Sequence, residues 1–339
     1  MTDPAHGPDT PESRARAWLR KAGLPRETPL VRLAGDASDR RFVRVLPPGG
    51  PSRILVVHAG PVDPETLPLI RVAELLRQLS VPVPVVHGAD AKLGIVVIED
   101  LGDTLLEEAA ATLPASRRRA LYREAVELIA KIQREGRRLA GSRAGPFGLA
   151  FDVAKLTQEL DFFVEHFVVG LRRRTLSAAA RRALEGEFRT LAADMAAEPR
   201  VLCHRDFHSR NLMLHRDRLH VIDFQDARMG PATYDLASLL RDAYVALDAT
   251  EVDRLLAHYQ TVTDVRDPAA LRRSFVRTTV QRALKALGTF GYQITVRGNP
   301  RYRDAIPRTL TYARDAIRQD RERRRMGELL GPVLDEPAS

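Results

Sequence analysis

A dense run of polar residues, HRDFHSRN at positions 204–211, interrupts an otherwise apolar stretch of the chain. The apolar runs VLC and LML flank it on either side. Charged and amide side chains carried into a protein interior destabilise it unless they are hydrogen-bonded or paired. Residues 201–224 are therefore expected to form strands around a polar loop that is either satisfied by local hydrogen bonds or used for chemistry.

Length and composition indicate a globular enzyme. The chain has 339 residues, of which 44% are hydrophobic, enough for a large core and two lobes. No apolar run approaches the roughly 18 residues of a membrane helix, and the start of the chain has no apolar signal core. We expect a cytoplasmic monomer that binds neither membranes nor nucleic acid. The single cysteine, Cys203, fits a buried small hydrophobe better than a nucleophile.

The net charge of +9 is dispersed, because the arginines are spread along helical segments and aromatic residues make up only 6% of the chain. A nucleic-acid-binding protein usually concentrates its basic residues in one patch. Dispersed positive charge favours a solvated surface, with a field that attracts an anionic substrate such as a nucleotide.

Hydrophobic periodicity divides the chain into a strand-rich part and a helical part. An early short helix is expected at 14–23 and one main helix within 63–79. Strands are expected at 28–35, 40–47, 53–60, 81–90 and 93–100. Long helices are expected at 115–139, 152–174, 177–197, 236–247, 250–263, 268–290 and 301–328.

This order predicts a bilobal α+β fold. Residues 13–100 would form a small antiparallel β-rich N-lobe with one main helix, on the nucleotide-phosphate side. Residues 101–328 would form a large helical C-lobe with an embedded β-hairpin catalytic loop and the metal and acceptor sites. We expect residues 1–12 to be a disordered lead and residues 329–339 to be a fraying tail.

The polar loop has the spacing that phosphoryl transfer needs. His204-Arg205-Asp206 is followed five residues after the aspartate by Asn211, and a later strand-like run delivers Asp223-Phe224. Kinase-like sites place a carboxylate base and two Mg²⁺-binding oxygens in this order. A zinc site built on His204 and His208 is disfavoured, because an arginine stands where the H-E-x-x-H pattern needs glutamate. The chain has no Walker motif and no G-x-S-x-G elbow.

The sequence resembles the aminoglycoside-phosphotransferase branch of the protein-kinase-like fold, and within it the kinases that phosphorylate N-acetylmuramate and N-acetylglucosamine at the anomeric hydroxyl in cell-wall recycling. The segments that carry the resemblance are GDASDRRFVRV (35–45), VVIEDLGD (96–103), CHRDFHSRNLM (203–213), VIDFQDARMGPATYDLASLL (221–240) and QRALKALGTF (281–290).

The resemblance implies an ATP-dependent, Mg²⁺-requiring sugar kinase. Asp206 would be the catalytic base, and Asn211 and Asp223 would ligate Mg²⁺. His204 would support the loop, and Asp235 would bond its backbone. Asp226 is either a further metal-site carboxylate or a turn residue. The interlobe joint that meets adenine through its backbone would consist of Glu99, Asp100 and Leu101.

One departure from the kinase pattern concerns the nucleotide phosphates. Kinases of this fold carry a lysine on the third strand, but RILVVHAGP has none. The positive charge that this lysine would supply is expected from Arg40, Arg41 or Arg44, because a guanidinium can clamp phosphate. His58 is another candidate. Backbone N–H groups and Ser38 would complete the phosphate site. Without the lysine, the partner role of Glu74 has no clear counterpart.

The acceptor side is less defined. Polar candidates near it, each with a structural alternative, are His208, Arg210, Gln225, Arg282 and Lys285. The carboxylate of N-acetylmuramate would suit the arginine-rich chain, whereas a polycationic aminoglycoside would need an acidic face. A kinase of another hydroxylated metabolite and an inactive nucleotide-binding regulator remain alternatives.

Overall fold

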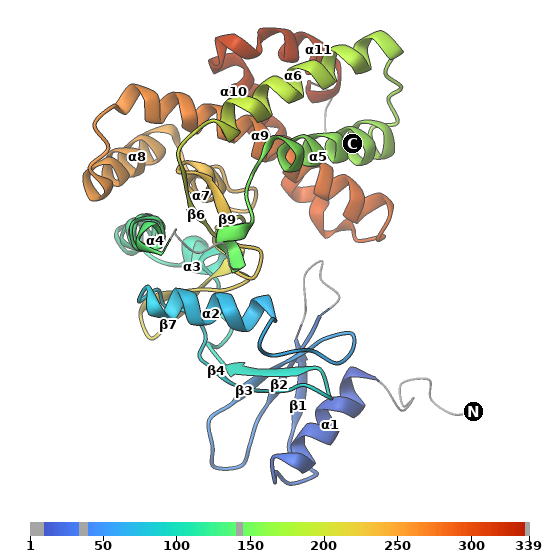
Figure 1. Cartoon of the computed structure of the whole chain (residues 1–339), viewed down its shortest axis with the longest axis vertical. Coiled ribbons are helices and arrows are strands. Elements are labelled where there is room, and N and C mark those ends of the chain that lie inside the picture. Colours follow the sequence, from blue (N-terminus) through green and yellow to red (C-terminus); the bar gives the residue numbers. More distant parts are fainter. Residues whose placement is uncertain (1–9, 34–39, 140–144, 336–339) are drawn as a thin grey trace. The chain divides into compact units, whose positions relative to one another are not determined.

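The computed structural model describes residues 10–33, 40–139 and 145–335 (Figure 1). The chain divides into two compact units, Met1–Asp103 with His220–Gln225, and Thr104–Leu219 with Asp226–Ser339. The expected C-lobe, 101–328, thus differs from the second unit at 101–103, at 220–225 and beyond 328, where the second unit continues. Residues 220–225 group with the first unit because the N–H of Val221 donates to the carbonyl of Pro82 (2.8 Å). The predicted α+β class is confirmed.

The first unit contains one antiparallel sheet, ordered β1-β2-β3-β5-β4. Its strands are β1 (Leu30–Leu33), β2 (Arg41–Val45), β3 (Arg53–Val57), β4 (Val86–Asp90) and β5 (Ile95–Glu99). Two helices accompany the sheet, α1 (Pro11–Lys21) and α2 (Pro68–Gln78). Ala15 and Leu19 of α1 pack against alternate residues of β2 and β3, which form a small core.

Residues 1–12 are expected to be a disordered lead, but residues 11 and 12 already belong to helix α1. Helix α1 begins at Pro11, because the Thr10 side chain caps it by accepting the Ser13 N–H (3.1 Å). Proline suits the first helical turn, where its missing N–H is not needed.

Helices dominate the second unit. They are α3 (Leu106–Thr112), α4 (Ala115–Arg138), α5 (Val153–Phe163), α6 (Ala178–Ala196), α7 (Tyr234–Leu240), α8 (Ala249–Thr263), α9 (Pro268–Thr295), α10 (Ile306–Gln319) and α11 (Arg324–Leu334). Short 3-10 helices occupy Gly145–Gly148, Ser209–Asn211, Pro300–Ala305 and Arg321–Arg323. None of the helices described is long and apolar enough to cross a membrane.

Two short antiparallel pairs frame the polar loop. Strand β6 (Arg200–Cys203) pairs with β9 (Arg228–Pro231), which the sequence did not reveal as a strand. Strand β7 (Leu212–His215) pairs with β8 (Arg218–Val221), the expected hairpin. Cys203 is buried and free, as predicted. The chain between β6 and β9 therefore has both of its ends fixed by one strand pair.

The prediction of a fraying tail at 329–339 is wrong for residues 329–335, the part that the structure describes. Helix α11 runs from Arg324 to Leu334, and its residues Leu330, Val333 and Leu334 are buried in the core of the second unit. The many charges that suggested fraying lie before this apolar face. Similarly, the long helix expected at 301–328 breaks at Asp320, and the helix expected at 236–247 ends at Leu240.

Helix α9 packs closely on the segment that continues α5. That continuation, Val164–Leu171, is a π-helix. A Cβ added at Gly288 would lie 2.7 Å from the Cα of Phe163, and one added at Gly291 would lie 2.3 Å from the carbonyl oxygen of His166. Only glycine leaves room for backbones this close, so these glycines set the position of α9.

Gly291→Ala should lower the free energy of unfolding by about 1–3 kcal/mol, because the added methyl overpacks this contact. The control is Gly186→Ala in α6, where nothing lies within 4 Å of the added Cβ; it should raise stability by about 0.5–1 kcal/mol. Urea unfolding measures both, and equal effects would contradict the packing role.

Leu330→Ala should destabilise the protein by about 2–5 kcal/mol, the range for a fully buried leucine. Glu328→Ala, whose side chain is 65% exposed, should change the free energy of unfolding by less than about 0.5 kcal/mol. If Leu330→Ala melted like the wild type, α11 would not be part of the folded core.

Candidate active site

A buried carboxylate holds the start of the polar loop. Asp235, in the first turn of α7, accepts the backbone N–H of His204 (2.7 Å) and of Arg205 (3.0 Å). Arg205 has a left-handed φ of 89°, a strained conformation for an arginine that persists only where neighbouring contacts impose it. The backbone bonding expected of Asp235 is thus present in the structure.

The rest of the loop is fixed by further side-chain bonds. The Asn211 amide nitrogen donates to the backbone carbonyl of Asp206 (2.9 Å), and Asp242 accepts the N–H of Ser209 (2.8 Å). His204 is 2% exposed, and its Nδ1 accepts the N–H of Asp206 (3.3 Å). These bonds fit the scaffold role expected of His204 and leave the Asn211 side-chain oxygen as the atom able to ligate a metal.

Three cations surround the predicted base. Lys285 Nζ lies 2.6 Å from Asp206 Oδ1, Arg282 lies 3.5 Å from the same oxygen, and Arg205 lies 3.9 Å from Oδ2. Burial of the Asp206 carboxyl opposes its charged form, but these cations outweigh burial and hold its pKa well below the usual range. The carboxyl is therefore ionised at neutral pH, as a base must be.

Glu159 supports this cluster from α5, a role that the sequence analysis missed. It is 6% exposed, accepts from Arg205 (3.3 Å) and accepts from Gln281 of α9 (3.0 Å). The sequence does contain a signal, since Glu159 stands between Leu156 and Phe163 on the apolar face of the helix. A carboxylate on such a face is expected to have a buried partner.

A cavity of about 110 Å³ opens beside Asp206, and all its lining residues belong to the second unit. That volume is below the roughly 300–1,000 Å³ of ligand pockets, so it would hold only part of a sugar. Polar and aromatic side chains make up much of the lining, among them Asp206, His208, Asp242, Tyr244, Arg282, Lys285 and Phe290.

The structure separates the five acceptor candidates. His208, Arg282 and Lys285 line the cavity. Arg210 does not; it makes a bidentate pair with Glu107 of α3 (2.7 and 3.0 Å) and stacks on the Tyr244 ring. This geometry favours a structural role for Arg210 over the expected contact with the sugar.

The fifth candidate, Gln225, lies in the first unit and donates to Asp223 Oδ1 (2.9 Å). Asp223 has a left-handed φ of 60°, and Arg40 also donates to its Oδ1 (3.0 Å). The predicted metal ligand is thus held between a guanidinium and an amide. The described residues include no group of three or more His, Cys, Asp or Glu side chains suited to a metal.

The other arginines proposed for phosphate binding are placed differently. Arg44 forms ion pairs with Asp100 (2.7 Å) and Asp103 (2.8 Å), so its charge is already neutralised and its expected phosphate role is not supported. Arg41 donates to the carbonyl of Arg40 (3.4 Å). Of the three arginines, Arg40 is the one that contacts Asp223, the predicted metal ligand. Ser38 lies outside the described residues.

The three joint residues have structural contacts. Glu99 accepts the N–H of Val85 through its side chain (3.2 Å), Asp100 accepts the Gly102 N–H (3.0 Å), and Leu101 is buried. None of the three caps α3, whose N-cap is Leu105. Asp226, in the second unit, pairs with Arg205 (3.4 Å).

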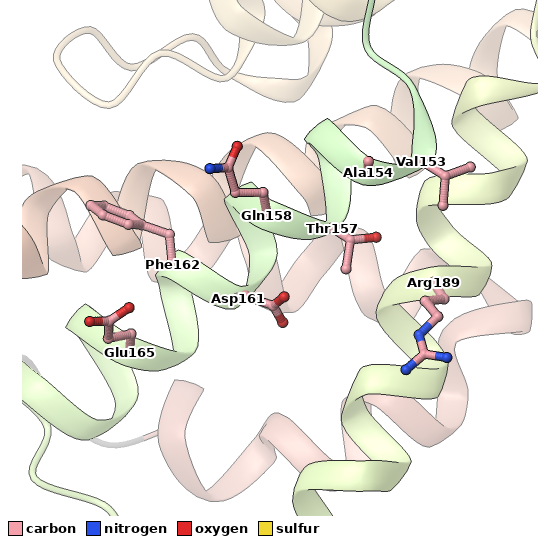
Figure 2. A pocket seen from close by; sticks show the side chains of 8 residues that line it. All are labelled: Val153, Ala154, Thr157, Gln158, Asp161, Phe162, Glu165 and Arg189. Atoms are coloured by element: carbon pink, nitrogen blue, oxygen red, sulfur yellow. The ribbon is translucent and has the colours of Figure 1, made fainter.

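A second, open depression of about 640 Å³ lies on α5 and α6 (Figure 2). None of the residues that line it, which include Asp161, Phe162 and Arg189, is a predicted site residue. Burial raises the pKa of Asp161. The cavity at Asp206 contains the predicted base together with His208, Arg282 and Lys285, so this cavity is the candidate active site.

Asp235→Ala should destabilise the protein by roughly 2–6 kcal/mol, because two buried N–H groups lose their acceptor. Asp253→Ala removes an exposed ion pair with Arg272 and should cost at most about 1 kcal/mol. Urea unfolding tests the difference; similar losses in the two variants would show that Asp235 does not anchor the loop.

Comparison with known proteins identifies the family of this chain. A model described as the phosphotransferase enzyme family matches residues 29–273. The N-acetylmuramate/N-acetylglucosamine kinase of Neisseria meningitidis serogroup B is 34% identical over 90% of this chain and 91% of that protein. The protein of the same name from Pseudomonas putida is 30% identical over 90% of this chain and 88% of its own length.

Among solved structures, an ADP-bound aminoglycoside phosphotransferase superposes with a TM-score of 0.60 at 15% identity, covering 97% of this chain and 98% of that one. At that identity the likeness concerns the fold alone. The family match covers most of the chain and contains the whole polar loop. The chain belongs to the phosphotransferase enzyme family.

Proposed function

We propose that this protein is an ATP-dependent kinase that transfers a phosphoryl group to the anomeric hydroxyl of N-acetylmuramate, N-acetylglucosamine or both, in the recycling of cell-wall sugars in the cytoplasm. The observation that carries the proposal is the position of an ionised Asp206 on the wall of the cavity. The names of the relatives at 30–34% identity supply the acceptor class.

The electrostatics of Asp206 suit an anomeric acceptor. Because Lys285, Arg282 and Arg205 lower the pKa of Asp206, its carboxylate is a weak base. An anomeric hydroxyl is more acidic than an ordinary alcohol, so it needs less help to lose its proton. Asp206 would orient the hydroxyl and accept its proton as that oxygen attacks the phosphorus.

The oxygen donors predicted for the metal are of the kind that Mg²⁺ takes in proteins. Mg²⁺ prefers few protein oxygens and keeps water and phosphate in its shell. Asn211 and Asp223 remain the proposed ligands, and Arg40 beside Asp223 (3.0 Å) is the proposed replacement for the missing lysine. When bound, the metal would neutralise charge on the phosphates of ATP.

An aminoglycoside acceptor fits the cavity less well. A polycation needs unneutralised carboxylates around it. In the described part of the cavity wall, Asp206 is paired with Lys285 (2.6 Å). Asp242 accepts two backbone N–H groups, from Ser209 and Tyr244 (both 2.8 Å). An inactive regulator would have no need of an ionised carboxylate at this position.

The proposal is tested by following ATP consumption with N-acetylmuramate, N-acetylglucosamine, glucose and an aminoglycoside. Consumption with one or both N-acetylated sugars is expected, and the product should hydrolyse readily in acid, as glycosyl phosphates do and 6-phosphate esters do not. An acid-stable product would refute the anomeric position. Activity on the aminoglycoside alone would refute the sugar assignment.

Asp206→Asn should lower kcat by about 10²–10⁴-fold, the typical contribution of a general base, with ADP binding preserved in calorimetry. The matched control is Asp217→Asn, in the turn between β7 and β8, where the side chain is 97% exposed; it should keep wild-type activity. Substantial turnover by Asp206→Asn would contradict the assignment of the base.

A further inference from the structure

The ammonium of Lys285 is one of the most confined cations of the second unit. Its side chain is 14% exposed, on α9, and lines the cavity. Among the described residues Asp206 is the one hydrogen-bonding partner of Nζ, at 2.6 Å. An ammonium has three N–H donors, so two remain for a ligand in the cavity.

We propose that Lys285 is a catalytic residue that donates a hydrogen bond to the acceptor oxygen during phosphoryl transfer. This inference rests on the proposed function, because it takes Asp206 as the base. A hydroxyl that gives its proton to Asp206 must lie about 2.6–3.2 Å from that carboxylate. Lys285 Nζ is itself 2.6 Å from Asp206 Oδ1, and both residues line the cavity, so a hydroxyl bound to Asp206 from the cavity side can also accept a hydrogen bond from Lys285.

The charges around Asp206 favour an anion at this position. Arg205 is shared with Glu159 (3.3 Å) and Asp226 (3.4 Å). Arg282 and Lys285, by contrast, share a single carboxylate at ion-pair distance among the described residues, which is Asp206. At ion-pair distance, these two cations of α9 therefore face a single carboxylate in the described part of the chain. Negative charge that develops on the acceptor oxygen would be stabilised there.

Lys285 and Arg282 differ in what else they bind. The Arg282 guanidinium is tied to the backbone carbonyl of Arg205 and to Ser238, and it stacks over Tyr234 at 4.7 Å. These contacts use its donors to hold the loop. Lys285 has no such anchors among the described residues, so it is the cation of the pair that is available to a substrate.

Phosphoryl transfer to the acceptor breaks two bonds and forms two. The acceptor O–H bond breaks and its proton passes to the Asp206 carboxylate, while the oxygen forms a bond to the γ-phosphorus of ATP. The bond from that phosphorus to the bridging oxygen breaks, and its electron pair leaves with ADP. Lys285 stays protonated throughout and stabilises the attacking oxygen; Asp206 afterwards releases its proton to water.

The experiment compares Lys285→Met with the wild type on N-acetylmuramate and N-acetylglucosamine. These acceptors share the reacting hydroxyl, but only the first carries a carboxylate. We expect kcat to fall about 10²–10³-fold on both, the loss typical of one donor to a developing oxyanion, with the KM of each sugar changed by less than about threefold. Lys131→Met, the same substitution on α4, should keep wild-type rates.

A loss of activity confined to N-acetylmuramate would overturn the proposal, because Lys285 would then recognise the carboxylate rather than the reacting oxygen. A kcat within about threefold of the wild type on both sugars would overturn it as well. ADP binding and thermal melting are measured on each variant to exclude misfolding. If wild-type protein phosphorylates neither sugar, the proposed function fails instead.

Should Lys285→Met fail to fold, Lys285→Arg carries the test, because it preserves the positive charge beside Asp206. A planar guanidinium cannot occupy the position of a compact ammonium. We expect at least about a tenfold loss of kcat on both sugars with an unchanged melting temperature. Wild-type turnover by Lys285→Arg would show that only the charge is needed and that no bond to the oxygen forms.

Discussion

The geometry of the site depends on the carboxylate of Asp235. Two backbone N–H groups at the start of the polar loop would be buried without a partner if it were absent, and each unsatisfied group costs about 1–3 kcal/mol. By accepting both, at 2.7 and 3.0 Å, Asp235 allows Arg205 to adopt its left-handed φ of 89°. That turn of the backbone places the Asp206 side chain among the cations of α9.

Helix α9 is the second element on which the site relies. Gly288 and Gly291 let its backbone approach the end of α5 and the π-helix of Val164–Leu171. The same helix presents Arg282 and Lys285 to the loop and Gln281 to Glu159. π-helices are rare and often occur at functional sites. Here the π-helix continues α5, which carries Glu159. The packing that stabilises the second unit thus also fixes the charges around Asp206, the proposed base.

These charges explain how a carboxylate can be both ionised and weakly basic. Cations lower its pKa below the usual range despite burial, and such a base suits an acceptor hydroxyl that is already acidic. The electrostatic state of Asp206 is therefore part of the case for an anomeric acceptor. The charge of Asp206 also accounts for the presence of Lys285, because burying an ammonium without an anionic partner would destabilise the protein.

The sequence by itself determined the α+β class, most helices and the loop motif, because periodicity and motif spacing are local properties of the chain; the backbone bonding of Asp235 is expected from the family resemblance. Tertiary structure alone decided that Glu159 pairs with Arg205, that Arg44 and Arg210 are neutralised by carboxylates, and that the charged C-terminal segment packs as α11. Each of these depends on a partner distant in sequence, Glu107 for Arg210 and Asp100 for Arg44. No local pattern encodes which of many charged side chains will meet when the chain folds.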